Sequence, residues 1–200
     1  MAPAQISSEA RGRRCPRSCG RSPDVVMRTT VYASPIGLIE IRGSEKGIVY
    51  LGFKSRRAAA GPPRSLPAAH PVLRKCVRQL DEYFCGRRRT FSLKLDLNGT
   101  EFQEKVWKEV AGIPYGRTAT YKDIARSVGK EKAVRAVGGA NHANPIPIIV
   151  PCHRVVGSGR KLTGYGGGLW RKYWLLEHER TGDGPARSRV ETLSRKKISL

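Results

Sequence analysis

The spacing of the apolar residues changes once along this chain, and that change limits the folds open to it. Before Asn98-Gly99, apolar and polar residues alternate over short segments bounded by turn residues, a pattern typical of strands. Beyond it, apolar residues recur every three or four positions, as on one face of a helix. The pattern predicts an α+β chain: a small domain of a few-stranded antiparallel sheet plus a helix over 27–98, then a helical domain over 99–180.

The N-terminal part contains three predicted strands, over 29–32, 38–42 and 48–53, with turn residues between them. Residues 54–69 have the composition of a loop, and the spacing of apolar residues predicts a helix over 72–84. Four alternating apolar residues between Phe91 and Leu97 indicate one more half-buried strand. Nothing in this part suggests chemistry.

The second part begins with a capping box formed by Thr100 and Gln103, which predicts a helix start. After a break at 113–116, Thr120 and Asp123 begin a second helix, and a third is expected from about 132 to 140. Two short helices joined around a glycine have the spacing of a (winged) helix-turn-helix. Any helical hairpin looks similar, so the spacing alone is a weak signal for DNA binding.

Charge narrows the range of partners. The chain has 38 Lys and Arg against 16 Asp and Glu, a formal net charge of +22. Nucleic acid or another anionic surface is therefore the favoured partner. No apolar run approaches the roughly 20 residues of a membrane span, so no membrane association is expected. The basic segments 1–26 and 181–200 are predicted to be disordered tails.

Five cysteines occur without a paired C-x-x-C spacing, which argues against a disulfide framework and against a Cys/His zinc site, including one at Cys15 and Cys19. A reducing, intracellular location fits this usage. Met27, at the start of the first strand pattern, is an alternative to Met1 as the translation start.

The sequence NPIPIIVPCHRVV, residues 144–156, is the most informative segment. Its apolar run, Ile146 to Val150, predicts a buried strand-like stretch that ends at Cys152 and His153. A buried thiol is mostly protonated at neutral pH, so a nucleophilic cysteine here needs a base and an orienting carboxylate. In an extended chain these neighbours point to opposite sides, so a water or a bend after Pro151 would have to connect them. A structural cysteine beside a hydrogen-bonded histidine fits the spacing equally well.

Three segments together closely resemble the O6-alkylguanine-DNA alkyltransferases: IPYGRTATYKDIA (113–125), RAVGGANHANPIPIIVPCHRVV (135–156) and GYGGGLWRKYWLLEHE (164–179). The PCHRV signature is highly specific. The resemblance is close over 99–180 and looser over 27–98, where TTVYASPIGLIEI is similar to the start of the family's N-terminal domain. It does not extend to the two tails.

The resemblance implies a role for five residues in catalysis. Cys152 would accept the alkyl group by direct displacement, and His153 would remove the thiol proton through a water. Glu179 would orient that histidine, and Asn144 would brace the active-site turn. Tyr121 would help to turn the nucleotide out and donate toward the leaving purine.

The resemblance also assigns residues that contact DNA and the extruded base. Arg135 matches the arginine finger that fills the vacated place in the duplex, and Gly138 lies on the same DNA-binding segment. Val155, Tyr165 and Gly166 fall on the loop that holds the extruded base. The implied protein is a monomer that repairs double-stranded DNA containing O6-alkylguanine in one turnover, without a cofactor.

Some positions depart from the family pattern. Ser44 and Val49 stand where members with an N-terminal zinc site have Cys and His, so no metal is expected. Asn141, His142 and Gly166 also differ from some relatives, which would affect the tolerance for bulky alkyl groups.

Two other functional classes compete with this interpretation. One is a non-enzymatic DNA-binding protein, either an alkyltransferase-like damage sensor or a helix-turn-helix regulator; the sensors lack a cysteine at the position of Cys152. The other is a cysteine-dependent hydrolase, which the direct Cys-His adjacency disfavours.

Overall fold

The computed structural model describes residues 26–54 and 70–182. The tails expected over 1–26 and 181–200, the Cys15–Cys19 pair and the loop expected over 54–69 lie outside this part, apart from their edge positions. In the part that is described, no helix combines the length and the apolar character that a membrane crossing requires.

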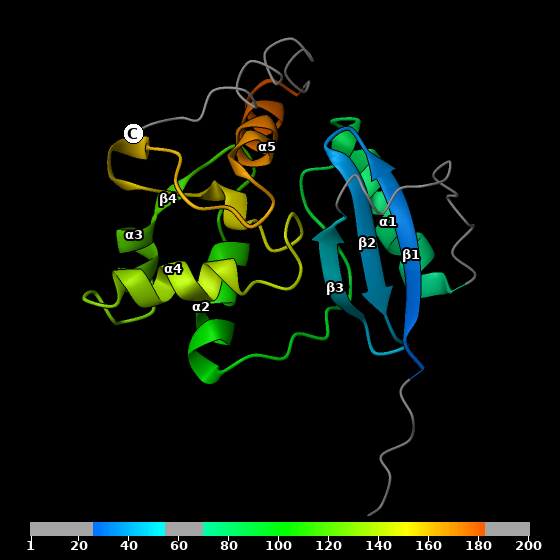
Figure 1. Ribbon diagram of the computed structural model, residues 1–200, viewed down its shortest axis with the longest axis horizontal. Helices are drawn as coiled ribbons and strands as arrows, with labels where there is room; N and C mark the ends of the chain where they lie inside the picture. Colours follow the sequence, from blue (N-terminus) through cyan, green and yellow to red (C-terminus); the bar gives the residue numbers. More distant parts are fainter. Residues whose placement is uncertain (1–25, 55–69, 183–200) are drawn as a thin grey trace, which may run out of the picture.

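The three N-terminal strands form one antiparallel sheet, as predicted, and their order in it is β1-β2-β3 (Figure 1). The strands are β1 Arg28–Ser34, β2 Gly37–Gly43 and β3 Ile48–Phe53. Gly37, at the β1–β2 turn, has a φ of 111°, a conformation that a residue without a Cβ adopts at little cost. The alternation of buried and exposed residues along β1 and β2 directs one face of the sheet to the core.

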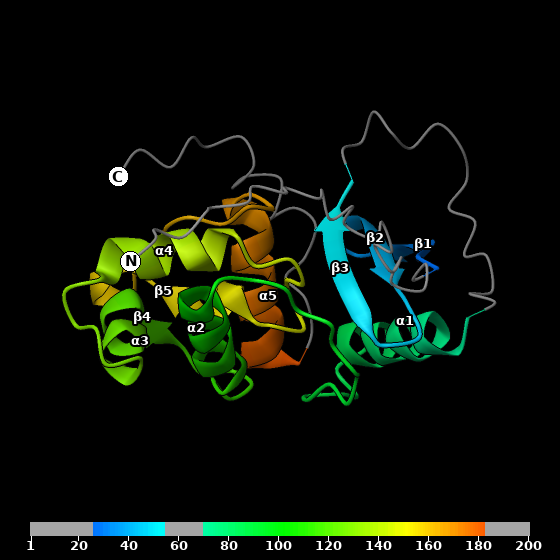
Figure 2. The same cartoon turned by 90° about the horizontal axis from the view of Figure 1, so that it is seen from below.

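Helix α1, Pro71–Phe84, covers that face of the sheet (Figure 2). Proline at its first turn has no amide hydrogen that would need a partner there. The buried side of the helix consists of residues at spacings of three and four, namely Leu73, Cys76, Gln79, Leu80 and Tyr83. The helix predicted over 72–84 is confirmed.

The prediction of a strand over Phe91–Leu97 was wrong. This segment meets the sheet in a single parallel bridge between Ile48 and Leu95. Farther along β3 the edge is occupied by a different segment, because the amide of Leu51 donates to the carbonyl of Pro145 at 2.8 Å. An alternating pattern predicts a strand only where a sheet edge is free to pair with it, and here that edge binds the loop before Cys152.

The remaining helices belong to the second part of the chain: α2 Glu101–Ala111, α3 Tyr121–Ser127, α4 Val134–His142 and α5 Leu169–Thr181. The predicted capping box of Thr100 with Gln103 is present, and the predicted helix start at Thr120 and Asp123 is a second capping box. Helix α4 begins two residues after the predicted start. A short parallel pair, β4 Ala119–Thr120 with β5 Val155–Val156, was not predicted. The fold class, a small sheet domain followed by a helical domain, is confirmed.

Two clusters of buried apolar residues form the core. The first combines the sheet and α1 with Ile146, Ile148, Trp174 and Leu175 from the second part of the chain. The second lies among α2, α3 and α4 and includes Val150 and Cys152. The loop over 144–152 therefore runs between the two clusters, and packing on both sides holds it in place.

Candidate active site

The apolar run before Cys152 forms a tight turn and not the strand-like stretch that was predicted. The amide of Val150 donates to the carbonyl of Ile146 at 3.0 Å, and Ile148 has a φ of 76°. Prolines 145, 147 and 151 have no amide hydrogen to contribute to a sheet, so the segment cannot pair as a regular strand. Ile146, Ile148 and Val150 are nevertheless buried.

Asn144 closes this turn from inside. Its Nδ2 donates to the carbonyl of Val150 at 2.8 Å, and its Oδ1 accepts from the amide of Ile146 at 3.0 Å. A β-branched residue with positive φ is strained, and such strain persists only where neighbouring contacts stabilise it. Asn144 supplies two of those contacts, so its position matches the bracing role that the family resemblance implies.

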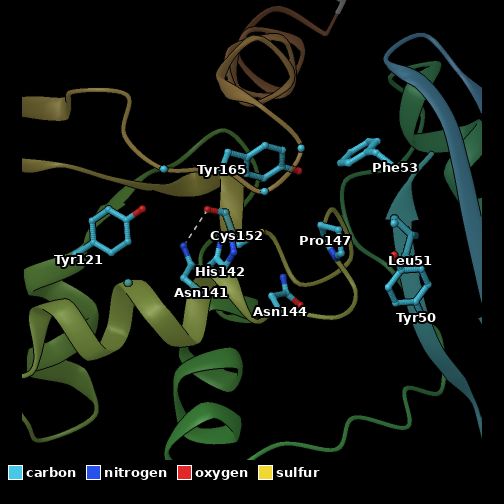
Figure 3. Close-up of a pocket in the computed structure, with 15 residues that line it drawn as sticks. Tyr50, Leu51, Phe53, Tyr121, Asn141, His142, Asn144, Pro147, Cys152 and Tyr165 are labelled. Carbon is cyan, nitrogen blue, oxygen red and sulfur yellow. Dashed lines mark hydrogen bonds between the residues drawn. The ribbon is translucent and has the colours of Figure 1, made fainter. Parts of the chain in front are cut away.

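The chain then bends into a single 3₁₀ turn, Cys152–Arg154. The bend follows Pro151, so the two neighbouring side chains are not separated as they would be in an extended strand. Cys152 is only 6% exposed and His153 is fully buried. Asn141, at the end of α4, donates to the carbonyl of Cys152 at 3.3 Å (Figure 3).

Cys152 lies at a cavity of about 400 Å³ between the two parts of the chain. One wall is β3, with Tyr50 and Phe53, and Figure 3 shows these residues on the side opposite Tyr121. Six residues predicted for the site line the cavity: Tyr121, Gly138, Asn144, Cys152, Tyr165 and Gly166. The structure thus brings together residues from four separate segments of the sequence.

His153 and Glu179 lie behind the cavity, where solvent does not reach their side chains. His153 Nε2 is 2.9 Å from Glu179 Oε1. His153 Nδ1 is buried and has no hydrogen-bond partner in the part of the chain that the structure describes. With the proton on Nε2 and directed to the carboxylate, Nδ1 carries a lone pair that can accept a proton.

Glu179 binds more donors than His153 alone. Arg154 donates from Nε to Oε2 and from Nη2 to Oε1, both at 2.8 Å. The hydroxyl of Tyr83 donates to Oε1 at 2.8 Å, and the amide of Gly116 donates to Oε2 at 3.1 Å. The carboxylate therefore holds together α5, the Cys152–Arg154 turn, the break after α2 and helix α1.

Burial and charge shift the pKa values at this site in different directions. Burial raises the pKa of Cys152 to about 11, and the Asn144 amide and the Lys172 charge offset this only in part. Burial lowers the pKa of His153 below its usual value, against the opposing effect of Glu179. Burial alone would raise the pKa of Glu179, but His153 and Arg154 outweigh it and hold that pKa far below the usual range. The resting site is a neutral thiol, a neutral imidazole and a carboxylate.

Lys172 is a site residue that the sequence did not identify. It is fully buried, and its Nζ donates to the carbonyls of Val155, Thr163 and Gly164 at 2.7, 2.6 and 3.2 Å. Burial lowers its pKa to about 8. One signal was available: Lys172 lies three and seven residues before Leu175 and Glu179, so it shares the buried face of α5. Tyr83 and Arg154 also had no predicted role.

The residues predicted to contact DNA or the extruded base differ in burial and in position relative to the cavity. Tyr121, at the start of α3, donates to the carbonyl of Thr163 at 3.4 Å. Arg135 is exposed on α4, and Gly138 lies one turn farther along the same helix, with open space where a Cβ would stand. The Val155 side chain is buried in the second core cluster and does not line the cavity, although its carbonyl binds Lys172.

The structure contains no grouping of three or more His, Cys, Asp and Glu side chains suited to a metal ion among residues 26–54 and 70–182. Ser44 is buried, and its hydroxyl accepts the amide of Lys46 at 3.2 Å, as in an ordinary turn. The absence of a metal remains a prediction.

Comparison with known proteins gives consistent matches over both parts of the chain. Residues 27–97 match the family model "6-O-methylguanine DNA methyltransferase, ribonuclease-like domain", and residues 101–181 match "6-O-methylguanine DNA methyltransferase, DNA binding domain". The methylated-DNA–protein-cysteine methyltransferase of Methanosarcina barkeri is 49% identical over 149 residues, covering 74% of this chain and 94% of that protein. The protein of the same name from Mycobacterium tuberculosis is 46% identical over 149 residues, covering 74% and 89%.

A solved structure agrees with these relatives. The crystal structure of Mycobacterium tuberculosis OGT in complex with DNA matches with a TM-score of 0.70 and 42% identity, over 82% of this chain and 98% of that one.

Proposed function

This chain belongs to the 6-O-methylguanine DNA methyltransferase family, and on that premise we propose that it repairs duplex DNA by moving the alkyl group of an O6-alkylguanine irreversibly onto its own Cys152. The observation that carries this assignment is the position of the Cys152 thiol. It lies at the cavity, with the His153–Glu179 pair directly behind it.

The chemistry begins with deprotonation. With a pKa of about 11, roughly one Cys152 in 10,000 would be a thiolate at neutral pH, so the thiol needs a base. His153 Nδ1 would take the proton through a water molecule, while Glu179 holds the ring through Nε2 and stabilises the imidazolium that forms.

The thiolate sulfur then attacks the alkyl carbon. A carbon–sulfur bond forms, the bond between that carbon and guanine O6 breaks, and the purine keeps the electron pair. Tyr121, on the side of the cavity opposite β3, is the proposed hydrogen-bond donor toward the departing purine. Because a thioether is stable and the reaction consumes the thiol, each molecule would act once and need no cofactor.

A base inside a duplex cannot bring O6 to a buried thiol, so the nucleotide must leave the stack, which costs a few kcal/mol. Helix α4 would lie against the DNA, with Arg135 filling the vacated position by stacking and charge. Gly138 on the same helix leaves room for close approach of the DNA backbone. Tyr165 and Gly166, with the neighbouring Gly164, would enclose the extruded base. A monomeric, intracellular protein is part of the same proposal.

Mass spectrometry of the protein after incubation with a duplex containing O6-methylguanine tests the proposal. We expect the gain of one methyl group per chain, mapped to Cys152, and none in Cys152→Ala. Cys85→Ala is the matched control because Cys85 is an exposed free cysteine away from the cavity, and it should be methylated like the wild type. Binding of the duplex without any mass gain would support a non-enzymatic damage sensor instead, and repeated turnover would also contradict the proposal.

A further inference from the structure

Glu179 Oε1 is shared by three donors from two segments, the Cys152–Arg154 turn and helix α1. They are His153 Nε2 at 2.9 Å, Arg154 Nη2 at 2.8 Å and the hydroxyl of Tyr83 at 2.8 Å. Tyr83 is 96 residues away from Glu179 in the sequence and belongs to the N-terminal part of the chain. Helix α1 therefore contacts the Glu179 carboxylate, which orients His153, the proposed general base.

The sharing has an electrostatic consequence. A carboxylate has about four lone-pair sites, and Glu179 already accepts five hydrogen bonds when Gly116 and both bonds from Arg154 are included. Each donor takes up part of the negative charge that would otherwise stabilise a protonated His153. The Tyr83 hydroxyl competes directly with the histidine because, like Arg154 Nη2, it binds the same oxygen, Oε1.

From this geometry we infer that Tyr83 is a positioning residue of the N-terminal domain that sets the proton affinity of His153 through their shared contact with Glu179 Oε1. The inference rests on the proposed function, since it concerns His153 as the general base of that reaction. The N-terminal domain would then contribute to the chemistry through Tyr83, in addition to lining the cavity with β3.

The other charged and titratable groups around this pair remain in place when the hydroxyl is removed. Arg154 and Lys172 both disfavour a protonated His153, and Cys152 lies on the cavity side. Tyr115 faces Glu179 from the break after α2. The substitution Tyr83→Phe changes only one donor in this set.

Tyr83→Phe also preserves the packing of the ring. The Tyr83 ring contacts Phe84, Phe91, Tyr115 and His178, with centroids 5.3 to 6.1 Å apart. The main-chain carbonyl of Tyr83 binds His178 Nε2 at 2.8 Å, a bond that the substitution does not touch. A second tyrosine provides the matched control: the hydroxyl of Tyr32 donates to Asp81 of the same helix at 2.8 Å, away from Glu179.

The experiment measures the single-turnover rate of methyl transfer from a saturating duplex as a function of pH, in the full-length protein. Transfer needs a neutral His153, so the rate should fall on the acid side as the imidazole becomes protonated. With one donor fewer on Oε1, Tyr83→Phe should move this acid limb upward by about 0.5 pH unit, and Tyr32→Phe should not move it. Titration of His153 by NMR should give the same shift without reference to activity.

The outcomes separate the two proposals. If the wild-type chain transfers no methyl group, the proposed function fails. If it does transfer, but Tyr83→Phe leaves both the acid limb and the His153 titration unchanged, Tyr83 only packs the domain interface and the inference is overturned. A lower melting temperature with an unchanged pH profile would also overturn it.

Discussion

Arg154 binds the carboxylate of Glu179 at two points, through Nε to Oε2 and through Nη2 to Oε1, both at 2.8 Å. Both side chains are almost completely buried. Arg154 also donates from Nη1 to the carbonyl of Ile113 at 2.6 Å, so its guanidinium group makes contacts on two sides. The pair gives the carboxylate behind His153 a fixed orientation, and its planar two-point geometry requires arginine.

Arg154→Lys should therefore be strongly destabilising. A lysine cannot reproduce the two parallel bonds, and a partly unpaired carboxylate in a buried site is costly. We expect the free energy of unfolding to fall by about 3 kcal/mol, measured by urea denaturation at neutral pH. Arg180→Lys is the control: Arg180 also makes two hydrogen bonds to a glutamate on α5, Glu177, but at the surface. A similar loss in both variants would contradict the importance of burial.

The dependence of stability on pH should report Glu179. Its pKa in the folded protein lies far below the value near 4.3 of an unfolded chain, so the unfolded state binds more protons in the acid range. The stabilisation is present above about pH 4.5 and is lost as the pH falls toward the folded pKa.

Glu179→Gln removes that carboxyl and should flatten the slope of unfolding free energy against pH below about pH 5. Urea denaturation measures this slope between about pH 3 and pH 7, a range that brackets the ordinary pKa of glutamate. Glu104→Gln, at an exposed position on α2, should keep the wild-type slope. If Glu179→Gln is as acid-sensitive as the wild type, other carboxyl groups control the acid transition.

Lys172 is expected to hold the loop that encloses the cavity. Replacing it by methionine keeps the length of the side chain but leaves three carbonyl oxygens, of Val155, Thr163 and Gly164, without their common donor. It also removes a positive charge that favours the Cys152 thiolate. We expect the single-turnover rate to fall at least about tenfold, equivalent to 1.4 kcal/mol in the barrier. The exposed Lys161→Met should keep the wild-type rate, and equal rates in the two variants would exclude this role.

Arg135→Ala should separate extrusion of the base from the transfer reaction. The side chain is exposed on α4, away from the thiol network, so its loss should reduce repair of a duplex much more than reaction with a free O6-alkylguanine base. Single-turnover rates on the two substrates measure the ratio. Lys105→Ala removes a charge from the exposed face of α2 and should lower neither rate selectively. Equal losses on both substrates would remove the finger assignment from Arg135.

Local signals predicted most of the elements. The alternation of apolar residues located β1, β2 and β3. The Thr100–Gln103 capping box located the start of α2, and Thr120 with Asp123 located the start of α3. Such signals depend on residues within about one helical turn or one strand of each other, which a sequence shows directly. They failed at 91–97 and at 146–150. In both segments the apolar pattern suited a strand, but the edge of β3 and the prolines around Ile146 decided the pairing.

The sequence by itself determined the chemical identity of the site, because a thiol followed by an imidazole in the PCHRV signature, with its flanking motifs, is highly specific. Only the tertiary structure decided how those groups are held and tuned. It places Tyr83 on the oxygen that orients His153, and it buries Lys172 among three carbonyls. The physical reason is that burial and hydrogen bonding between distant segments set proton affinities, and neither has a signature in the order of neighbouring residues.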